Sequence, residues 1–347
     1  MSENHRFVVA THSFLLAIET DAQWRLQNLH VLARGHHYGI ALPAANGDRF
    51  IAKGRGELLT LYQPDGARGG GYLAAGERLL GEEFGEIHQI AQHEGLLFFA
   101  NTGRNSLVWA DADGAVLGRY HFGGKEEDID HINSVFPLGS GRVACLLHGR
   151  GRRPSQIAIL QLHGRTQIEL LHRGFLRHMG CHNLFVDRQR LVYNASEVGK
   201  VVTVDVRSGR IERELRFPGH TKGLSMLDRA FIVGYSDRVE RALRTHSRGH
   251  LAVIDRRTLE TKARIVLNHP ALPQPAGNVN EIRCLSHAEY GQHTTDAEAL
   301  TAALRRLTSY SAAGRLQLLT RAQATRSVAI AKSFWRKRVW GKDGRES

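Results

Sequence analysis

Polar residues recur near the start of six short apolar stretches of this 347-residue chain, and histidine is among them in five of the six, at a spacing that suggests the side chains meet in space. Each stretch begins with a five-residue cluster (36–40, 86–90, 131–135, 180–184, 220–224 and 278–282), and the fifth residue of every cluster is aliphatic. The first and third residues are never aliphatic, and five of the twelve are histidine, which binds metals and transfers protons near neutral pH. These twelve positions, called the polar ring below, are His36, Tyr38, Glu86, His88, His131, Asn133, Gly180, His182, His220, Lys222, Asn278 and Asn280.

Three alternate clusters carry histidine in the first position, namely His36, His131 and His220. If the six clusters surround an axis, three neutral imidazoles would face one another and leave an open coordination position, which is an arrangement of catalytic metal sites. We therefore predict a divalent metal ion, Zn, Fe or Mn, bound by these three residues. His37 is an alternative to His36 as the inward residue of the first cluster.

The remaining polar positions are candidates for proton transfer and substrate binding. His88 and His182 occupy third positions and would be acid–base groups or further metal ligands, while Lys222 and Tyr38 would act as a base or bind an anion. A polar side chain removed from water costs a few kcal/mol unless it is paired, so we interpret the ring as a binding surface. A metal-free site for a polar ligand and a hydrated structural channel are the alternatives. The other ring residues assigned to this site are Glu86, Asn133, Asn278 and Asn280.

The elements that position these residues form a repeat. The third residues of successive clusters lie 40 to 58 residues apart, and three more stretches with strand patterning follow each of the first five clusters. Four antiparallel strands per repeat are typical of a β-propeller blade. The sixth repeat has only its opening strand near 278–285, and the N-terminal stretches 6–12, 14–20 and 25–32 would complete it. The sequence therefore predicts an all-β, six-bladed propeller over residues 5–290, closed by N-terminal strands that pair with the last blade.

Two basic segments interrupt blades between their second and third strands. One is the stretch 148–154, and the other contains Arg238, Arg241 and Arg244. Long loops at such positions would cover the channel or contact an anion, and solvated turns are equally compatible with the sequence.

The C-terminal segment 294–347 differs in composition from the repeats. Thr295 and Glu298 form a capping-box pattern, and Leu300, Leu304 and Leu307 recur at helical spacing. The segment holds 11 Lys and Arg against 4 Asp and Glu. We predict a basic α-helical extension that binds an anionic membrane surface or a protein partner, or forms an oligomer; alternatively, its apolar stripe packs on the propeller.

Composition narrows the possible classes of protein. The net charge of +13 favours anionic partners, although nothing specifically indicates nucleic acid. Three scattered cysteines do not suggest a disulfide framework, no apolar stretch reaches 18 residues, and no signal-peptide pattern is seen. We expect a cytoplasmic protein, with peripheral membrane association as a possibility.

The repeat 199–211, which leads into 217–224, resembles the repeat of YVTN/NHL-type propellers. Within that group, the peptidylglycine amidating lyase and the oligogalacturonate lyases are similar in holding a divalent metal by histidines from several blades. The resemblance implies metal binding by His36, His131 and His220. The chain departs from the secreted amidating lyase in lacking a signal sequence and disulfides.

These observations together predict a metal-dependent enzyme of the lyase or hydrolase class that acts on an anionic small molecule or sugar. The alternative is a non-catalytic propeller that binds an anionic glycan, a membrane surface or a protein partner. A third hypothesis is metal-free group transfer by histidine, such as sulfuryl transfer.

Overall fold

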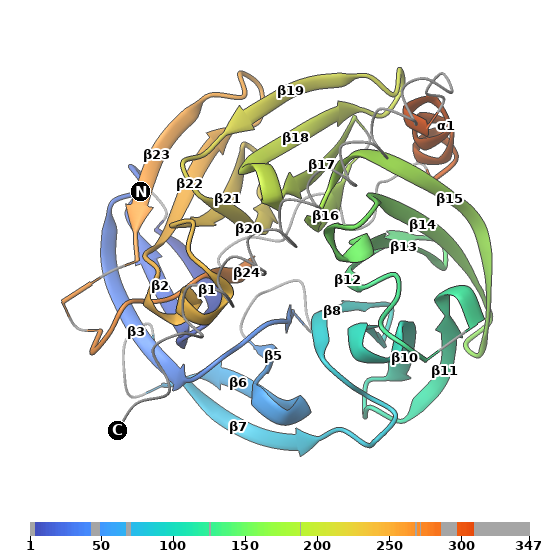
Figure 1. Ribbon diagram of the computed structural model, residues 1–347. Helices are drawn as coiled ribbons and strands as arrows, with labels where there is room; N and C mark the ends of the chain where they lie inside the picture. The colour runs from blue at the N-terminus through green and yellow to red at the C-terminus, as the bar shows by residue number, and fades with distance from the viewer. Residues whose placement is uncertain are drawn as a thin grey trace, which may run out of the picture.

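The fold is a ring of six four-stranded antiparallel sheets, as Figure 1 shows. The computed structural model describes residues 4–42, 49–66, 71–124, 126–187, 189–267, 269–270, 272–285 and 297–308. From the innermost strand outwards, blade 1 is β4 (Ile40–Ala41), β5 (Phe50–Lys53), β6 (Leu58–Pro64) and β7 (Tyr72–Leu79); blade 2 is β8 (Ile87–His93), β9 (Leu96–Asn101), β10 (Ser106–Asp111) and β11 (Val116–His121); blade 3 is β12 (Ile132–Gly139), β13 (Arg142–Leu147), β14 (Pro154–His163) and β15 (Gln167–Met179). Blade 4 is β16 (Cys181–Val186), β17 (Arg190–Ala195), β18 (Lys200–Asp205) and β19 (Ile211–Arg216); blade 5 is β20 (His220–Met226), β21 (Ala230–Ser236), β22 (Gly249–Asp255) and β23 (Thr261–Val266); blade 6 is β24 (Val279–Cys284), β1 (His5–Thr11), β2 (Phe14–Thr20) and β3 (Leu26–Arg34).

The predicted closure of the ring is confirmed. Strand β24 pairs with β1 in antiparallel register, so that Phe7 lies opposite Cys284 and Val9 lies opposite Ile282. Blade 6 therefore combines the two ends of the propeller sequence, and the pairing covers strand edges that an open array would expose.

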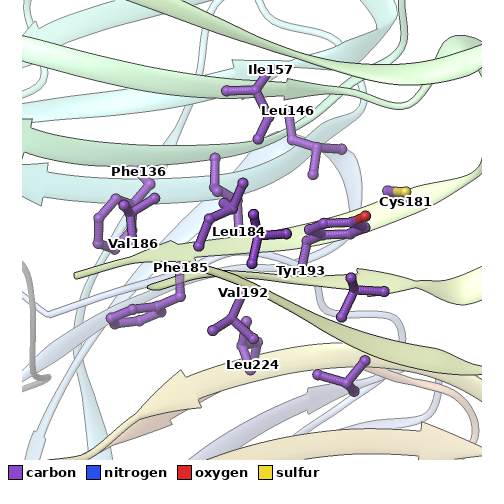
Figure 2. Close-up of a cluster of buried hydrophobic side chains, with 14 of the residues drawn as sticks. Phe136, Leu146, Ile157, Cys181, Leu184, Phe185, Val186, Val192, Tyr193 and Leu224 are labelled. Atoms are coloured by element: carbon purple, nitrogen blue, oxygen red, sulfur yellow. The ribbon is translucent and has the colours of Figure 1, made fainter. Parts of the chain in front are cut away.

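The core lies between neighbouring blades, where alternating β-branched, leucine and aromatic residues interdigitate. Figure 2 shows one such cluster, in which Phe136 of blade 3, Leu184 and Tyr193 of blade 4, and Leu224 of blade 5 belong to a single buried group. All six aliphatic residues that end the clusters are at most 3% exposed. These residues are Ile40, Ile90, Val135, Leu184, Leu224 and Ile282. The prediction that they pack in the interior is confirmed.

The innermost strands are irregular at the positions of the polar ring. The pairing register shifts within β8, β12, β16 and β20, in each case inside the five-residue cluster. A β-bulge places two residues opposite one and redirects the side chains beside it. Strict alternation therefore fails at these positions, and the first and third residues of a cluster do not always share a face.

Short 3-10 helices join the second and third strands of five blades. They are η1 (Arg55–Glu57), η2 (Thr102–Arg104), η4 (Gly149–Gly151), η5 (Ser196–Val198) and η6 (Arg241–His246), while η3 (Phe122–Gly124) connects blades 2 and 3. These turns lie at the end of each blade where the innermost strand begins, because the strands are antiparallel. They are thus placed to line the same end of the ring as the polar clusters.

The helix α1 (Ala297–Thr308) lies against blade 3 beside β15 (Figure 1). Leu300, Leu304 and Leu307 are buried in the cluster shared by blades 3 and 4, so the predicted apolar stripe packs on the propeller. The rest of the predicted extension, 309–347, lies outside the described residues, as do Thr295 and the prediction of membrane or partner binding there. No helix in the described part of the chain is long and apolar enough to cross a membrane.

Candidate functional site

A cavity of about 260 Å³ opens at the end of the ring where the polar clusters lie, and is called the axial cavity below. Seven polar-ring residues line it, which come from blades 1 to 5 of the ring. Six further lining residues come from the turns and second strands that surround the opening. The lining residues are Tyr38, Glu86, His88, His131, His148, Arg150, Arg152, His182, Glu197, His220, Lys222, Arg241 and Arg244. Five of the six clusters therefore meet at this cavity, and the sixth, 278–282, contributes no lining residue.

Aromatic rings form a continuous belt around this cavity. Neighbouring ring centroids lie 4.6 to 5.8 Å apart along the series Tyr38, His88, His131, His148, His182 and His220. The ammonium nitrogen of Lys222 lies 4.6 Å from the centroid of the Tyr38 ring and so links the two ends of the series. Polar atoms of five imidazoles and one amine are thereby concentrated in one small volume.

Neither histidine considered for the inward position of blade 1 lines the cavity. His36 packs behind Tyr38, with 4.3 Å between their ring centroids, and also contacts His12 at 4.1 Å. His37 is buried, and its Nδ1 lies 3.0 Å from the carbonyl oxygen of Gly35. Blade 1 instead contributes Tyr38, which corrects the sequence-based choice between the two histidines.

The three asparagines of the polar ring also lie outside the cavity lining and connect blades to one another. Asn133 donates a hydrogen bond of 2.9 Å to the carbonyl oxygen of Cys181 in the next blade. Asn280 donates one of 2.7 Å to the carbonyl oxygen of His37, and the Oδ1 of Asn278 accepts one of 2.5 Å from Ser247. All three are at most 4% exposed, and these hydrogen bonds satisfy atoms that would otherwise be costly to bury, although Oδ1 of Asn280 has no hydrogen-bond partner among the described residues. Asn133 and Asn280 lie at register shifts in the pairing of β12 and β24, which explains why the alternation of the sequence did not separate them from the lining residues.

The first position of the cluster is left-handed in three successive blades. Glu86 has φ 50°, His131 has φ 56° and Gly180 has φ 64°. Glycine adopts this conformation without steric cost, whereas Glu and His carry strain of about 1 kcal/mol or more. The two strained residues both line the axial cavity, and Gly180 does not. Strained residues concentrate at functional sites, so this pattern marks Glu86 and His131 as functional candidates.

His131 is paired with a carboxylate that the sequence pattern did not reveal. Its Nδ1 lies 2.9 Å from Oδ2 and 3.0 Å from Oδ1 of Asp128, three residues earlier in the chain. The carboxylate accepts the Nδ1–H proton and thereby leaves Nε2 as the proton acceptor of the ring. Arg150 in turn donates to the carbonyl oxygen of Asp128 at 3.0 Å, which ties η4 to this loop. Among the described residues, His131 is the belt histidine that has a carboxylate within hydrogen-bonding distance.

Four arginines surround the opening of the cavity and are called the cation rim below. Arg150 and Arg152 belong to the turn at η4, and Arg241 and Arg244 belong to η6. Both basic segments noted in the sequence therefore contribute to the cavity opening, and Arg150, Arg152 and Arg241 are exposed to solvent there. In the part of the chain that the structure describes, Arg152, Arg241 and Arg244 have no hydrogen bond or ion pair through their side chains.

Burial and the local positive charge keep His88, His148, His182 and His220 neutral. Burial, strengthened by the charge of Lys222, lowers the pKa of His88 and His182 well below its usual value, and burial does the same for His148. The pKa of His220 falls to about 3 for the same reasons. His36 and His12, behind the belt, have a pKa of about 3 and about 2. These imidazoles are therefore neutral near pH 7.

Lys222 has the most unusual environment in the site. Burial lowers its pKa to about 7, and the positive charges of Arg244 and Arg241 act in the same direction. Glu281 raises it in part, but that carboxylate is engaged elsewhere: Arg283 pairs with it at 2.7 Å and Gln89 donates to it at 2.8 Å. The Arg283–Glu281 pair is thus a separate, buried ion pair.

The predicted metal site receives no support from these side chains. In the part of the chain that the structure describes, no three His, Cys, Asp or Glu side chains are grouped so as to hold a metal ion. His36 lies outside the cavity lining, and His131 and His220 are separated along the belt by His148 and His182. Lys222 and the cation rim would also repel a divalent cation. The residues present therefore do not fit a divalent metal ion.

The residues that sequence reasoning missed as members of this site are Asp128, His148 and Glu197. Asp128 lies three residues before the cluster histidine, and an acidic residue at that distance is too common to be recognised without the fold. His148 was noted only as part of a basic loop. It reaches the belt because β13 lies directly beside β12, with His148 N bonded to His131 O at 3.0 Å.

Comparisons with known proteins establish the architecture. No family model matches the sequence, and no curated protein matches it. Solved structures with this arrangement include a protein of unknown function from Bacteroides caccae, with a TM-score of 0.57, 11% identity and coverage of 81% of this chain and 99% of that one. A chain of a nidogen/laminin complex aligns with a TM-score of 0.56 and 13% identity over 82% of this chain and 100% of its own length. A periplasmic gluconolactonase from Pseudomonas aeruginosa aligns with a TM-score of 0.52 and 11% identity over 81% of this chain and 99% of its own.

The chain is a six-bladed β-propeller. Identities of this size show the fold and leave the activity to be argued from the site.

Proposed function

We propose that this protein is an enzyme that binds an anionic small molecule or sugar derivative in the axial cavity and converts it by acid–base chemistry of the hydrolase or lyase class. The observation that carries the proposal is the convergence, in one cavity of about 260 Å³, of unpaired arginines, neutral histidines and the Asp128–His131 pair. A structural channel has no need for this combination, because each buried polar group carries a cost when it is unpaired.

The cation rim supports an anionic ligand. Four guanidinium groups line the cavity against the two carboxylates of Glu86 and Glu197. Guanidinium groups bind carboxylates and phosphates through paired hydrogen bonds. These hydrogen bonds become stronger where water is excluded. A cavity of this volume accommodates a small molecule and not a polymer, which favours a monosaccharide-sized substrate.

The acid–base chemistry would centre on His131 and His88. Asp128 holds the Nδ1–H of His131, and the carbonyl oxygen of Glu86 lies 2.8 Å from Nδ1 of His88. Both hydrogen bonds favour the tautomer in which Nε2 accepts a proton, and the two rings are neighbours at 5.0 Å between centroids. One imidazole would remove a proton from water or from a carbon acid, and the other would serve as the relay.

Hydrolysis of a sugar ester or lactone is one reaction that this arrangement would perform, because a base beside a bound anion activates water for attack on a carbonyl carbon. A gluconolactonase is among the proteins of similar fold, and its name places a reaction of this kind on the same architecture. The predictions of a cytoplasmic location and of a membrane or protein partner for the basic extension remain proposals.

The test is ligand binding followed by turnover. Isothermal titration with sugar phosphates, aldonates and uronates should detect binding that neutral sugars of equal size do not show. The double substitution Arg241→Gln, Arg244→Gln should weaken that binding at least about 100-fold, since charge-assisted hydrogen bonds contribute roughly 1.5 to 3 kcal/mol each. The matched control is Arg229→Gln, because Arg229 is 95% exposed in the turn after β20, at the opposite end of the blade.

The outcomes separate the hypotheses. Binding lost in the arginine variant, with turnover that depends on His131, supports the enzyme. Binding without turnover of any bound ligand would make the protein a binding propeller. Equal binding of charged and neutral sugars would overturn the proposal.

A further inference from the structure

We propose that Lys222 is a nucleophile that forms an imine with an aldehyde or ketone group, so that the substrate of the axial cavity is an anionic carbonyl compound. This inference rests on the proposed anion site and specifies its substrate class.

The position of Lys222 is the first argument. It is the third residue of β20, it lines the cavity, and it is 7% exposed. Its amine has neither a hydrogen bond nor an ion pair to any described residue. The contact that it does make is with the face of the Tyr38 ring, at 4.6 Å from the centroid.

Comparison with another buried lysine of this chain shows that the lack of a carboxylate partner at Lys222 is unusual. Lys53 is 6% exposed, and its ammonium pairs with Glu57 at 3.2 Å. Lys200, on the outer part of blade 4, pairs with Glu214. A buried ammonium without a carboxylate is strongly destabilising, so a lysine in such a place is retained for a ligand or for chemistry. Lys222 therefore differs from the structural lysines by its lack of a partner and not by its burial.

The ionisation state of the amine is the second argument. Burial, Arg244 and Arg241 lower its pKa to about 7, so that a large fraction is neutral near neutral pH. The neutral amine has the lone pair that attacks a carbonyl carbon, and desolvation beside other cations is a known way to activate a lysine for this reaction.

The step balances with groups present in the cavity. The Nζ lone pair attacks the carbonyl carbon, and one of the two Nζ protons passes to the carbonyl oxygen to give a neutral carbinolamine. The second Nζ proton is then relayed by the imidazoles of His182 and His220 to the hydroxyl group, the C–O bond breaks, and water leaves. Amine and carbonyl thus give imine and water, without any oxidant or reductant.

The imine would connect the three parts of the site. A protonated imine withdraws electrons from the neighbouring carbon and acidifies its C–H bond, and the Asp128–His131 pair is the base within the same cavity. The cation rim would hold the carboxylate or phosphate of the substrate. The chemistry that follows is elimination or carbon–carbon cleavage, which belongs to the lyase class.

Reductive trapping on the full chain tests this directly. The protein is incubated at pH 7 with glyoxylate, a small anionic aldehyde, and sodium cyanoborohydride, which reduces imines and spares aldehydes. Intact mass and peptide mapping should show a single adduct per chain at Lys222. Labelling should be at least about 10-fold faster than with propanal, a neutral aldehyde of similar size, and should be suppressed by inorganic phosphate.

Internal controls make each outcome decisive. Lys262 is 53% exposed on the outermost strand of blade 5 and reports background reactivity in the same sample. The substitution Lys222→Arg keeps the charge, and should remove the adduct while anion binding persists. The inference is wrong if Lys262 is labelled as fast as Lys222 in the wild-type protein, or if Lys222→Arg retains turnover. In either case the proposed function would stand if anion binding still depended on Arg241 and Arg244. If neither the imine adduct nor this anion binding were found, the inference and the proposed function would both be overturned.

Discussion

Replacing Lys222 by methionine should stabilise the protein, and the gain should depend on pH in a defined way. The lysine pKa falls from 10.5 to about 7 on folding. At about 1.4 kcal/mol per pKa unit, this gap corresponds to roughly 4 to 5 kcal/mol of cost for holding the charged form in the cavity. Methionine has a similar length and no charge, so Lys222→Met should raise the free energy of unfolding at pH 7 by roughly 3 to 5 kcal/mol.

The sign follows from where the proton is bound. Below about pH 7 the lysine is protonated in both the folded and the unfolded chain, so the wild type carries the full cost and the gain from methionine is greatest. Between about pH 7 and 10.5 the unfolded chain keeps the proton and the folded chain loses it. The wild type therefore becomes more stable as the pH rises, and the difference between the two proteins should shrink and nearly vanish at the upper limit.

Urea unfolding followed by tryptophan fluorescence at pH 6, 7, 8, 9 and 10 measures this difference. Lys262→Met is the matched control, because Lys262 is exposed on β23 and paired with Asp255 at 3.4 Å; its effect should stay within about 0.5 kcal/mol at every pH. A difference between wild type and Lys222→Met that is constant from pH 6 to 10, or a destabilising substitution at pH 7, would refute the reasoning.

Three further results are expected. Asp128→Asn should lower kcat by about 100-fold or more, because the amide no longer holds the Nδ1–H tautomer of His131, and the acidic limb of the pH–rate profile should move, a change that simple loss of packing would not produce. His131→Gly should abolish turnover and yet leave the thermal midpoint unchanged or higher, since glycine relieves the left-handed strain at φ 56°; a large destabilisation would contradict this. Leu304→Ala should cost roughly 2 to 5 kcal/mol in denaturant unfolding because this side chain of α1 is fully buried against the propeller, whereas Leu243→Ala, at a residue 51% exposed, should change little.

Much of the architecture could be predicted because it depends on local patterns. Strand periodicity and turn residues recur in every blade, and the aliphatic residue that ends each cluster identifies the inner strand. The last repeat lacks three strands, and the N-terminal stretches were predicted to supply them. The pairing of β24 with β1 confirms this.

The location of the site could be predicted from the sequence, but the contacts among its side chains could not. The repeat brought Tyr38, His88, His182 and Lys222 to one end of the ring, as their equivalent positions required. Their roles depend on distances between blades that no local pattern encodes, such as the gap between Lys222 and a carboxylate.

What the sequence alone determined is the set of polar residues at one end of a six-fold array, because repeat spacing and alternation are properties of each strand taken by itself. What only the tertiary structure decided is which of them face a common cavity. Bulges in the inner strands turned Asn133 and Asn280 towards the neighbouring blades, and His36 and His37 packed behind Tyr38. The structure also placed Asp128 against His131 and left Lys222 without a counter-ion, since both depend on the packing of loops from different blades around one axis.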